Sequence, residues 1–312
     1  MNDQVDQVNE AQGVVVGYDG SPSARLALEW AAETARQLGS RLTIVHSVNL
    51  SMVPAFPAVD LSHVEPMLEQ AAKSLVDEGA EHASSVLEAS HISTQYWLGS
   101  PAGQLVDASR GADLLIVGSR GRGRLRSGIL GSTSYAVTAH AHCPVVVVRG
   151  PVETEDGAAV LHALRPGPEH PVVVGIDDSD AAQRALDAAA AWAVREHAML
   201  HVVRVAHSAA MEAWTYAETA RASTEDTHAT REHAEQSVAR QAGRARADHP
   251  GLEVTTQVLY GDPGRTLAEL TRRTAGLVVV GSRGHGGFTG MLLGSVSHRL
   301  LHDGECPVLV VR

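Results

Sequence analysis

The chain repeats itself, and this internal repeat is the feature that most limits what it can fold into. The segment VVVGYDGS begins at Val14, and its counterpart VVVGIDDS begins at Val172. The two halves also end alike, with CPVVVVR finishing at Arg149 and CPVLVVR finishing at Arg312. Solenoid proteins repeat every ~20–50 residues, so a repeat this long is a duplicated domain. The length of 312 residues also suits two domains of about 150 residues each.

The repeat predicts where the domains begin and end. We expect a first domain at residues 1–150, with residues 1–12 as a flexible arm, and a second domain at residues 171–312. Residues 151–170 lie between them and are rich in Pro, Gly and acidic side chains, which is typical of a linker. A short turn is expected at Val160–Leu164. An ordered connection packed along one domain is the alternative.

Short apolar runs alternate with helical patterns inside each copy. Val14–Tyr18 is continuously apolar, as expected of a strand buried on both faces. Ser21–Gly39 has helical spacing, with Ser21 as N-cap and Gly39 as the stop. The other elements expected in the first copy are strands at Arg41–Val48, Ile92–Leu98, Leu114–Val117 and Val145–Val148, and helices at Val64–Ala89, Ala102–Arg110 and Ser132–Ala141.

This alternation of strands and helices predicts parallel βαβ units joined by right-handed crossovers. Each copy should therefore form an α/β domain: a doubly wound, five-stranded parallel sheet with helices on both faces. The first and fourth strands should lie side by side at the switch point, where ligands bind in sheets of this kind.

Composition excludes several classes of function. The formal net charge of −11 argues against a nucleic-acid partner, because phosphate contacts need clustered Lys and Arg. No apolar run reaches the ~18 residues of a membrane span, and the start MNDQVDQVNEAQG is unlike a secretory signal. Neither HExxH nor paired CxxC occurs, so no metal site is expected. These features predict a cytoplasmic protein without membrane contact.

A glycine-rich loop follows the fourth strand of each copy with identical spacing, G-x2-G-x9-G-S. It consists of Gly118, Gly121, Gly131 and Ser132 in the first copy, and of Gly281, Gly284, Gly294 and Ser295 in the second. Glycines let backbone N–H groups approach a polyphosphate without an intervening side chain. The serine then opens a helix, whose free N–H groups and positive dipole end favour anions. Two loops of identical spacing therefore predict two phosphate-binding sites.

With these motifs, the sequence resembles a tandem universal stress protein of the ATP-binding branch. The resemblance covers residues 13–149 and 171–312 and includes two complete copies of the family's G-x2-G-x9-G-[ST] marker. It implies a Rossmann-like, adenine nucleotide α-hydrolase-like fold for each domain. It also implies that each copy binds one ATP, with or without Mg2+.

The resemblance also implies which residues contact the nucleotide. Asp19 and Asp177 match the aspartate on the ribose or adenine side. Ser47 and Val205 match the adenine wall, where Ser47 departs from the usual valine and predicts weaker packing of the base. The other contact positions are Gly17, Val117, Gly118, Arg120, Gly121, Gly131, Ser132 and Thr133 in the first copy, and Gly175, Val280, Gly281, Arg283, Gly284, Gly294, Ser295 and Val296 in the second.

Structural alternatives exist for these positions. Asp19 and Asp177 could cap the helices that follow them, and the glycines could serve tight turns alone. Arg120 and Arg283 could be solvated surface charges.

The loops also differ in charge, which predicts a steeper salt dependence at the first site. The first loop carries Arg120, Arg122, Arg124 and Arg126, whereas the second carries Arg283, His285, Gly287 and Thr289.

The sequence predicts a binding protein rather than an enzyme. It has neither the Walker signature GxxxxGK[ST] nor a GxSxG nucleophile elbow. The expected function is ATP-dependent regulation of a stress or dormancy response, read out by an unidentified protein partner. A scaffold with vestigial loops and a slow ATPase are the alternatives.

Assembly is predicted from the last strands. Val145–Val148 and Val308–Val311 are apolar edge strands that need covering. The resemblance implies dimerisation through this strand, so we expect the two copies to pair within one chain as a pseudo-dimer. Association of two chains into a homodimer stays open.

Overall fold

The structure is a computed structural model that describes residues 13–49, 61–121, 130–149, 165–206, 224–272, 274–284 and 292–312. Side chains are described at these positions except at 61–63 and 224–230. The chain divides into two compact units, unit 1 (Met1–Leu161) and unit 2 (His162–Arg312). Each unit contains one copy of the repeat and is considered by itself.

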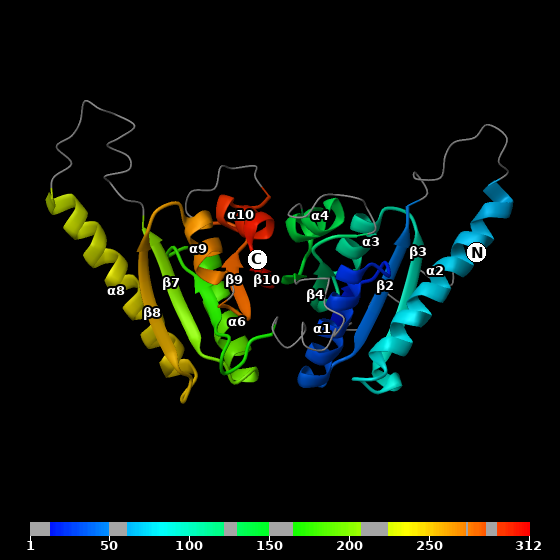
Figure 1. The fold of residues 1–312 in the computed structure, drawn as a ribbon, viewed down its shortest axis with the longest axis horizontal. Coiled ribbons are helices and arrows are strands. Elements are labelled where there is room, and N and C mark those ends of the chain that lie inside the picture. Colours follow the sequence, from blue (N-terminus) through cyan, green and yellow to red (C-terminus); the bar gives the residue numbers. More distant parts are fainter. Residues whose placement is uncertain are drawn as a thin grey trace, which may run out of the picture. The chain divides into compact units, whose positions relative to one another are not determined.

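Unit 1 alternates strands and helices along the chain (Figure 1). Its elements are β1 (Gly13–Gly17), α1 (Pro22–Leu38), β2 (Leu42–Val48), α2 (Leu61–Ala83), the 3-10 helix η2 (Ala89–His91), β3 (Ile92–Leu98), α3 (Pro101–Ala108), β4 (Ala112–Gly118), α4 (Ser132–His140) and β5 (Val145–Val148). Its strands pair in the order β3-β2-β1-β4-β5, and every pair is parallel. The first and fourth strands are therefore neighbours, as predicted.

Unit 2 has the same topology. Its elements are β6 (Val172–Gly175), α6 (Asp180–Arg195), β7 (Leu200–Ala206), α8 (Thr224–Asp248), β8 (Val254–Tyr260), α9 (Pro263–Thr271), β9 (Leu277–Gly281), α10 (Ser295–Asp303) and β10 (Val308–Val311). The strand order is β8-β7-β6-β9-β10, again parallel throughout. Here β6 and β9 flank the switch point.

The helices cover both faces of each sheet. In unit 1, α1 packs with α2 and α3 packs with α4. Right-handed crossovers from β1 to β2 and from β3 to β4 run in opposite directions along the sheet, which places these two helix groups on opposite faces. The strands between them are buried on both sides; Val14, Val15 and Val16, for example, have no exposed surface. The expected doubly wound α/β fold is confirmed.

Local sequence signals set the ends of α1. The Ser21 hydroxyl accepts a hydrogen bond from the backbone N–H of Ala24 at 3.2 Å, and Pro22 follows in the first turn. Gly39 ends the helix in a left-handed conformation with φ of 59°. Both the N-cap and the stop were predicted, because each depends only on a few neighbouring residues.

Helix α2 differs from the prediction of Val64–Ala89. It spans Leu61–Ala83 and so ends six residues earlier than expected. Just beyond its end, the hydroxyls of Ser84 and Ser85 donate to the backbone carbonyls of Glu81 and His82 at 2.6 and 2.8 Å. Serine side chains that bond nearby carbonyls compete with helix continuation, and the chain turns here towards η2.

Part of the expected linker packs on unit 2. Gly167 and His170 form an antiparallel bridge, and Arg165 donates to Glu196 Oε1 at 2.7 Å. The side chains of Arg165 and Glu196 are only 11% and 6% exposed. The expected arm at 1–12 and the expected turn at Val160–Leu164 lie outside the described residues.

Candidate functional site

A pocket of about 510 Å³ lies in unit 1 at the carboxyl ends of its strands, where ligands bind in doubly wound sheets. Every contact position inferred for the first copy lines it: Gly17, Asp19, Ser47, Val117, Gly118, Arg120, Gly121, Gly131, Ser132 and Thr133. The fold thus brings together residues that are spread over more than a hundred positions of the sequence. Their role in nucleotide binding stays a prediction.

Sequence reasoning missed other residues of this pocket. Tyr18, His46, Asn49 and Leu105 also line it. Leu105 belongs to α3, which carried no recognisable motif, although its place after β3 puts it at the same edge of the sheet. The switch-point rule itself is the signal that could have found it, because it directs attention to every strand end.

The first glycine of each loop is required by packing. A Cβ at Gly118 would lie 2.6 Å from the backbone oxygen of Ser23, and one at Gly281 would lie 2.8 Å from Ala181 Cβ. These glycines let the first turn of α1 or α6 approach the end of β4 or β9. A Cβ at Gly17 would similarly lie 2.9 Å from Leu105 Cδ1. A structural role is therefore sufficient to explain Gly118 and Gly281, whereas at Gly17 the end of the Leu105 side chain could shift to make room.

The second glycine of each loop faces the predicted aspartate. A Cβ at Gly121 would lie 2.8 Å from Asp19 Oδ2, and one at Gly284 would come still closer to Asp177 Oδ2. Each aspartate therefore presents a carboxylate oxygen to the glycine loop, across the switch point.

Neither aspartate caps a helix. Asp19 Oδ1 accepts from the backbone N–H of Ser21 at 3.0 Å, and Asp177 Oδ1 accepts from that of Ser179 at 3.2 Å. The N-caps of α1 and α6 are the two serines themselves. Each aspartate thus accepts a hydrogen bond from the serine that caps the helix and helps to hold it in place.

The described surroundings do not explain the third glycine of each loop in this way. Gly131 and Gly294 have φ of −63° and −72°, which any residue adopts. Among the atoms of the described residues, a Cβ at Gly131 would meet nothing closer than Ser119 O at 3.5 Å, and one at Gly294 nothing closer than Arg283 Cα at 3.4 Å. Neither the backbone nor any described neighbour requires glycine at these two positions.

These two glycines are N-caps that offer no side chain to their helices. The N-caps of α1, α3, α6 and α9 accept a hydrogen bond from the first turn through Ser21, Ser100, Ser179 and Asp262. Among the α-helix N-caps that the structure describes, those of α4 and α10 alone lack this bond. The first N–H groups of an uncapped helix are available to an anion. In unit 1 they lie beside the pocket, which Ser132 and Thr133 line.

Backbone and serine contacts fix both ends of each glycine loop. Gly131 N–H donates to Ser119 O at 2.9 Å, and Gly294 N–H donates to Ser282 O at 2.7 Å. The buried Ser134 hydroxyl donates to Gly118 O at 2.7 Å. Residues 122–129 and 285–291 lie outside the described residues, so the predicted difference in salt dependence stays a prediction.

Two further predicted positions can be located. The Ser47 hydroxyl donates to Gly99 O at 3.1 Å, so its polar group is satisfied by the β3–α3 loop, and its counterpart Val205 is half-buried on β7. Arg120 lines the unit 1 pocket, with its backbone N–H donating to Ser23 Oγ at 3.2 Å. Arg283 is exposed.

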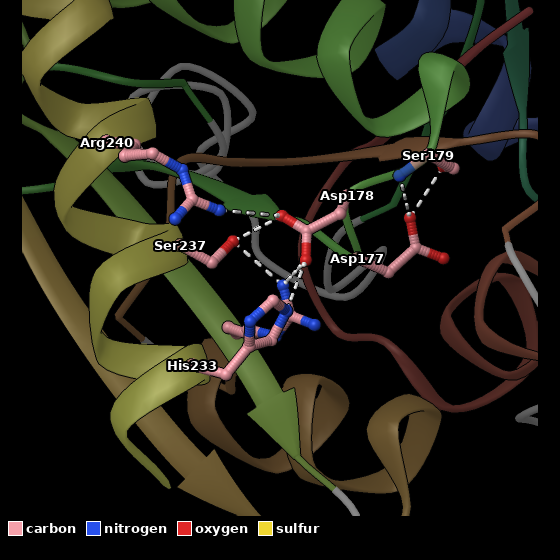
Figure 2. Close-up of polar contacts among 7 residues, drawn as sticks. Asp177, Asp178, Ser179, His233, Ser237 and Arg240 are labelled. Atoms are coloured by element: carbon pink, nitrogen blue, oxygen red, sulfur yellow. Dashed lines mark hydrogen bonds and ion pairs between the residues drawn. The ribbon is translucent and has the colours of Figure 1, made fainter. Parts of the chain in front are cut away.

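A polar cluster in unit 2 was not predicted (Figure 2). Asp178 accepts hydrogen bonds from Arg204 on β7 and from Ser237 on α8. His233 Nε2 and Arg240 Nη2 lie 3.5 and 4.0 Å from its carboxylate. Burial acts to raise the pKa of Asp178, but the hydrogen bonds from Ser237 and Arg204 and the nearby positive charges hold it below its usual value.

Two general features complete the description. Within the described part of the chain, no group of three or more His, Cys, Asp or Glu side chains could hold a metal ion. The helices of that same part include none with the length and apolarity needed to cross a bilayer.

Comparison with known proteins identifies the family. A sequence profile described as the Universal stress protein family matches residues 11–149 and again 169–312. A universal stress protein of Mycobacterium tuberculosis is 33% identical over 319 residues, covering 97% of each chain. Another from Mycolicibacterium smegmatis is 33% identical over 304 residues, covering 96% of this chain and 97% of its own.

Among solved structures, a universal stress protein from Archaeoglobus fulgidus matches with a TM-score of 0.68. It covers 97% of this chain and 98% of that chain at 21% identity, so the likeness is one of fold. Together with the duplicated sheet and the two glycine loops, these matches show that the chain belongs to the universal stress protein family and carries the family's domain twice.

Proposed function

We propose that the protein binds ATP at two sites, one at the switch point of each unit. The triphosphate would lie against the N-terminus of α4 or α10, and the base and sugar would lie towards Asp19 or Asp177. Cytoplasmic ATP would then be the ligand, with Mg2+ held mainly by the phosphates, since protein sites commonly supply Mg2+ with only one or two carboxylates.

The observation that carries this proposal is the pair of uncapped helices. A capping side chain stabilises a helix by about 1 kcal/mol relative to alanine and by a few tenths of a kcal/mol relative to glycine, yet α4 and α10 begin at glycines that offer none. Neither glycine is required by its φ angle or by the atoms of the described residues around it. A ligand that takes the place of the capping side chain explains both positions, and a triphosphate supplies the needed anionic oxygens.

The rest of the pocket suits a nucleoside. Its volume of about 510 Å³ lies in the usual range for small-molecule sites. Val45, Val48, Val117 and Leu105 give it an apolar wall, on which a base can pack. Asp19 also lines the pocket and would offer a carboxylate acceptor to a sugar hydroxyl.

We further propose that nucleotide occupancy regulates a stress or dormancy response through a protein partner. The pairing of the two copies through β5 and β10 remains a prediction from the apolar sequence of these strands. A scaffold with vestigial loops would show no nucleotide dependence at all.

The direct test is to identify and count the bound nucleotide. Protein purified without added nucleotide should release an adenine nucleotide on denaturation, detectable by chromatography with mass spectrometry. Calorimetric titration of stripped protein with ATP should then give a stoichiometry near two. Absence of adenine nucleotide together with no heat of binding would refute the proposal.

A further inference from the structure

Two consecutive aspartates of unit 2 have carboxylates that contact different parts of the unit. Asp177 Oδ1 accepts from the backbone N–H and the hydroxyl of Ser179, at 3.2 and 2.6 Å, and its Oδ2 faces Gly284. Figure 2 shows the carboxylate of Asp178 turned instead towards α8. One residue therefore faces the candidate site, and the next joins the same loop to a helix.

The contacts of Asp178 form a closed triangle. Arg204 and Ser237 each donate to its carboxylate, and Arg204 Nη1 also donates to Ser237 Oγ at 2.8 Å. Ser237 has no exposed surface, and the side chains of Arg204 and Asp178 are 17% and 27% exposed. Charge-assisted hydrogen bonds at partly buried positions are among the stronger polar contacts in proteins, so the loop is firmly tied to β7 and α8.

The backbone at Asp178 adopts a conformation that few residue types tolerate. Its φ is 63°, in the left-handed region that glycine favours and that aspartate and asparagine also enter. The matching position of unit 1 is Gly20, with φ of 74°. The loop after the first strand therefore uses the same conformation in both units.

Unit 1 attaches the same loop by other means. The Tyr18 hydroxyl donates to Glu78 on α2 at 3.3 Å, and the Tyr18 carbonyl lies 2.7 Å from His46 Nδ1 on β2. The residue that ties this loop to its neighbours thus precedes Asp19 in unit 1, where it is Tyr18. In unit 2 it is Asp178, which follows Asp177.

From this geometry we propose that Asp178 is a positioning residue for the unit 2 site. By tying the loop to β7 and α8, it holds the Asp177 carboxylate against the glycine loop at Gly284. Under the proposed function Asp177 contacts the ribose or adenine side of the nucleotide, so this positioning would favour a nucleoside triphosphate over bare triphosphate. The ligand part of the inference rests on the proposed function, and the positioning part does not.

The test uses the full chain carrying Gly121→Glu, so that unit 2 alone can respond to ligand. Asp178→Gly is then added, because glycine keeps the left-handed backbone and removes the carboxylate. In nucleotide-free protein, hydrogen exchange at the Ser179 amide should accelerate about tenfold, because its acceptor Asp177 is no longer held in place. Unchanged exchange would overturn the proposal.

A second measurement separates positioning from general loosening. Calorimetric affinity for ATP should fall about tenfold in Asp178→Gly, the loss of roughly one charge-assisted hydrogen bond. Affinity for inorganic triphosphate should change less than about twofold, since the α10 terminus is untouched. Equal weakening of both ligands would contradict the role of Asp178 and indicate a purely structural effect.

Two matched variants serve as controls. Asp178→Asn keeps hydrogen-bonding capacity and tolerates the left-handed backbone, so it should restore part of the ATP preference. Asp187→Asn removes another contact of α8, the ion pair with Arg244 at 3.2 Å, and should alter neither measurement. If the Gly121→Glu parent binds no ATP, the proposed function fails for unit 2, and the exchange experiment still decides the positioning role.

Discussion

The two units agree at the glycine loop and differ at the loop after the first strand. In both units the helix after the glycine loop has a glycine N-cap without a side-chain hydrogen bond, and a backbone hydrogen bond to a serine carbonyl closes the loop. The loop after the first strand, by contrast, is held by Tyr18 in unit 1 and by Asp178 in unit 2. The glycine N-cap therefore recurs in both units, whereas different side chains hold the loop after the first strand.

The contacts beside the glycine loop also differ between the two units. In unit 1, Arg120 N–H donates to Ser23 Oγ, but the matching residue in unit 2 is Ala181, which has no hydroxyl. Asp177 instead accepts from the Ser179 hydroxyl. Several arrangements can hold a loop, but few leave a helix terminus open for an anion.

The largest effect should come from filling the glycine loop of one unit. Gly121→Glu places a side chain against Asp19 and a negative charge where phosphate would lie, so unit 1 should lose ATP affinity by at least ~100-fold. Gly284→Glu should do the same for unit 2, and each variant should bind one ATP per chain by calorimetry.

Gly243→Glu is the matched control, because a Cβ there would meet no atom of the described residues within 4 Å. Its stoichiometry should stay at two. If either loop variant also retained two sites, the assignment of the glycine loops to ATP would be wrong.

A smaller effect is expected from adding a side-chain cap. Gly131→Ser supplies the acceptor that α4 lacks, which should stabilise ligand-free protein by a few tenths of a kcal/mol. The same hydroxyl occupies the helix terminus, so ATP affinity at unit 1 should fall about tenfold. Thermal melting with and without ATP measures both changes, and Gly294→Ser should behave alike in unit 2. A rise in both stability and affinity would argue against a phosphate at this terminus.

The residues with left-handed backbone, Gly20 in unit 1 and Asp178 in unit 2, allow a sharper comparison of the two loops that follow the first strands. Gly20→Ala introduces a Cβ at φ of 74° and should destabilise the protein by about 1 kcal/mol. Gly103→Ala is its control, because it lies inside α3 with Ser100 Cβ 3.6 Å away and should be neutral or stabilising by up to ~1 kcal/mol. Denaturant unfolding distinguishes the two. Equal stability would mean that unit 1 does not need glycine at this turn.

The smallest effect should appear in acid. The pKa of Asp178 is lowered, so its charged form contributes stability above its unfolded pKa, near 3.8, and this contribution is lost as the pH falls through the folded pKa. Arg204 and Arg240 are the cations that face it, and the His233 ring lies beside them. Wild type should therefore melt a few degrees above Asp178→Asn at neutral pH, and the gap should narrow below about pH 4.

A difference in melting temperature between wild type and Asp178→Asn that stayed constant down to pH 2 would show that the Asp178 charge does not stabilise unit 2. Asp187→Asn provides the comparison, since it removes a carboxylate of α6 outside this cluster.

The sequence by itself determined the fold and part of the lining of the unit 1 pocket, but not Tyr18, His46, Asn49 or Leu105. Its signals are local or repeated: apolar strand runs, the Ser21 cap, the Gly39 stop and two loops of identical spacing. Such features act through neighbouring residues, so they can be read along the chain. The switch-point rule then placed the predicted contacts at one edge of the sheet, and the unit 1 pocket lies there.

Only the tertiary structure separated glycines that look alike in the sequence. Gly118 is required because α1 passes over it, whereas none of the described residues crowds the Cβ position of Gly131. It also brought Asp178 to Arg204 and Ser237, which are 26 and 59 residues away along the chain. The physical reason is the same in both cases. Steric room and long-range hydrogen bonds depend on which elements pack together, and that information is absent from any short stretch of sequence.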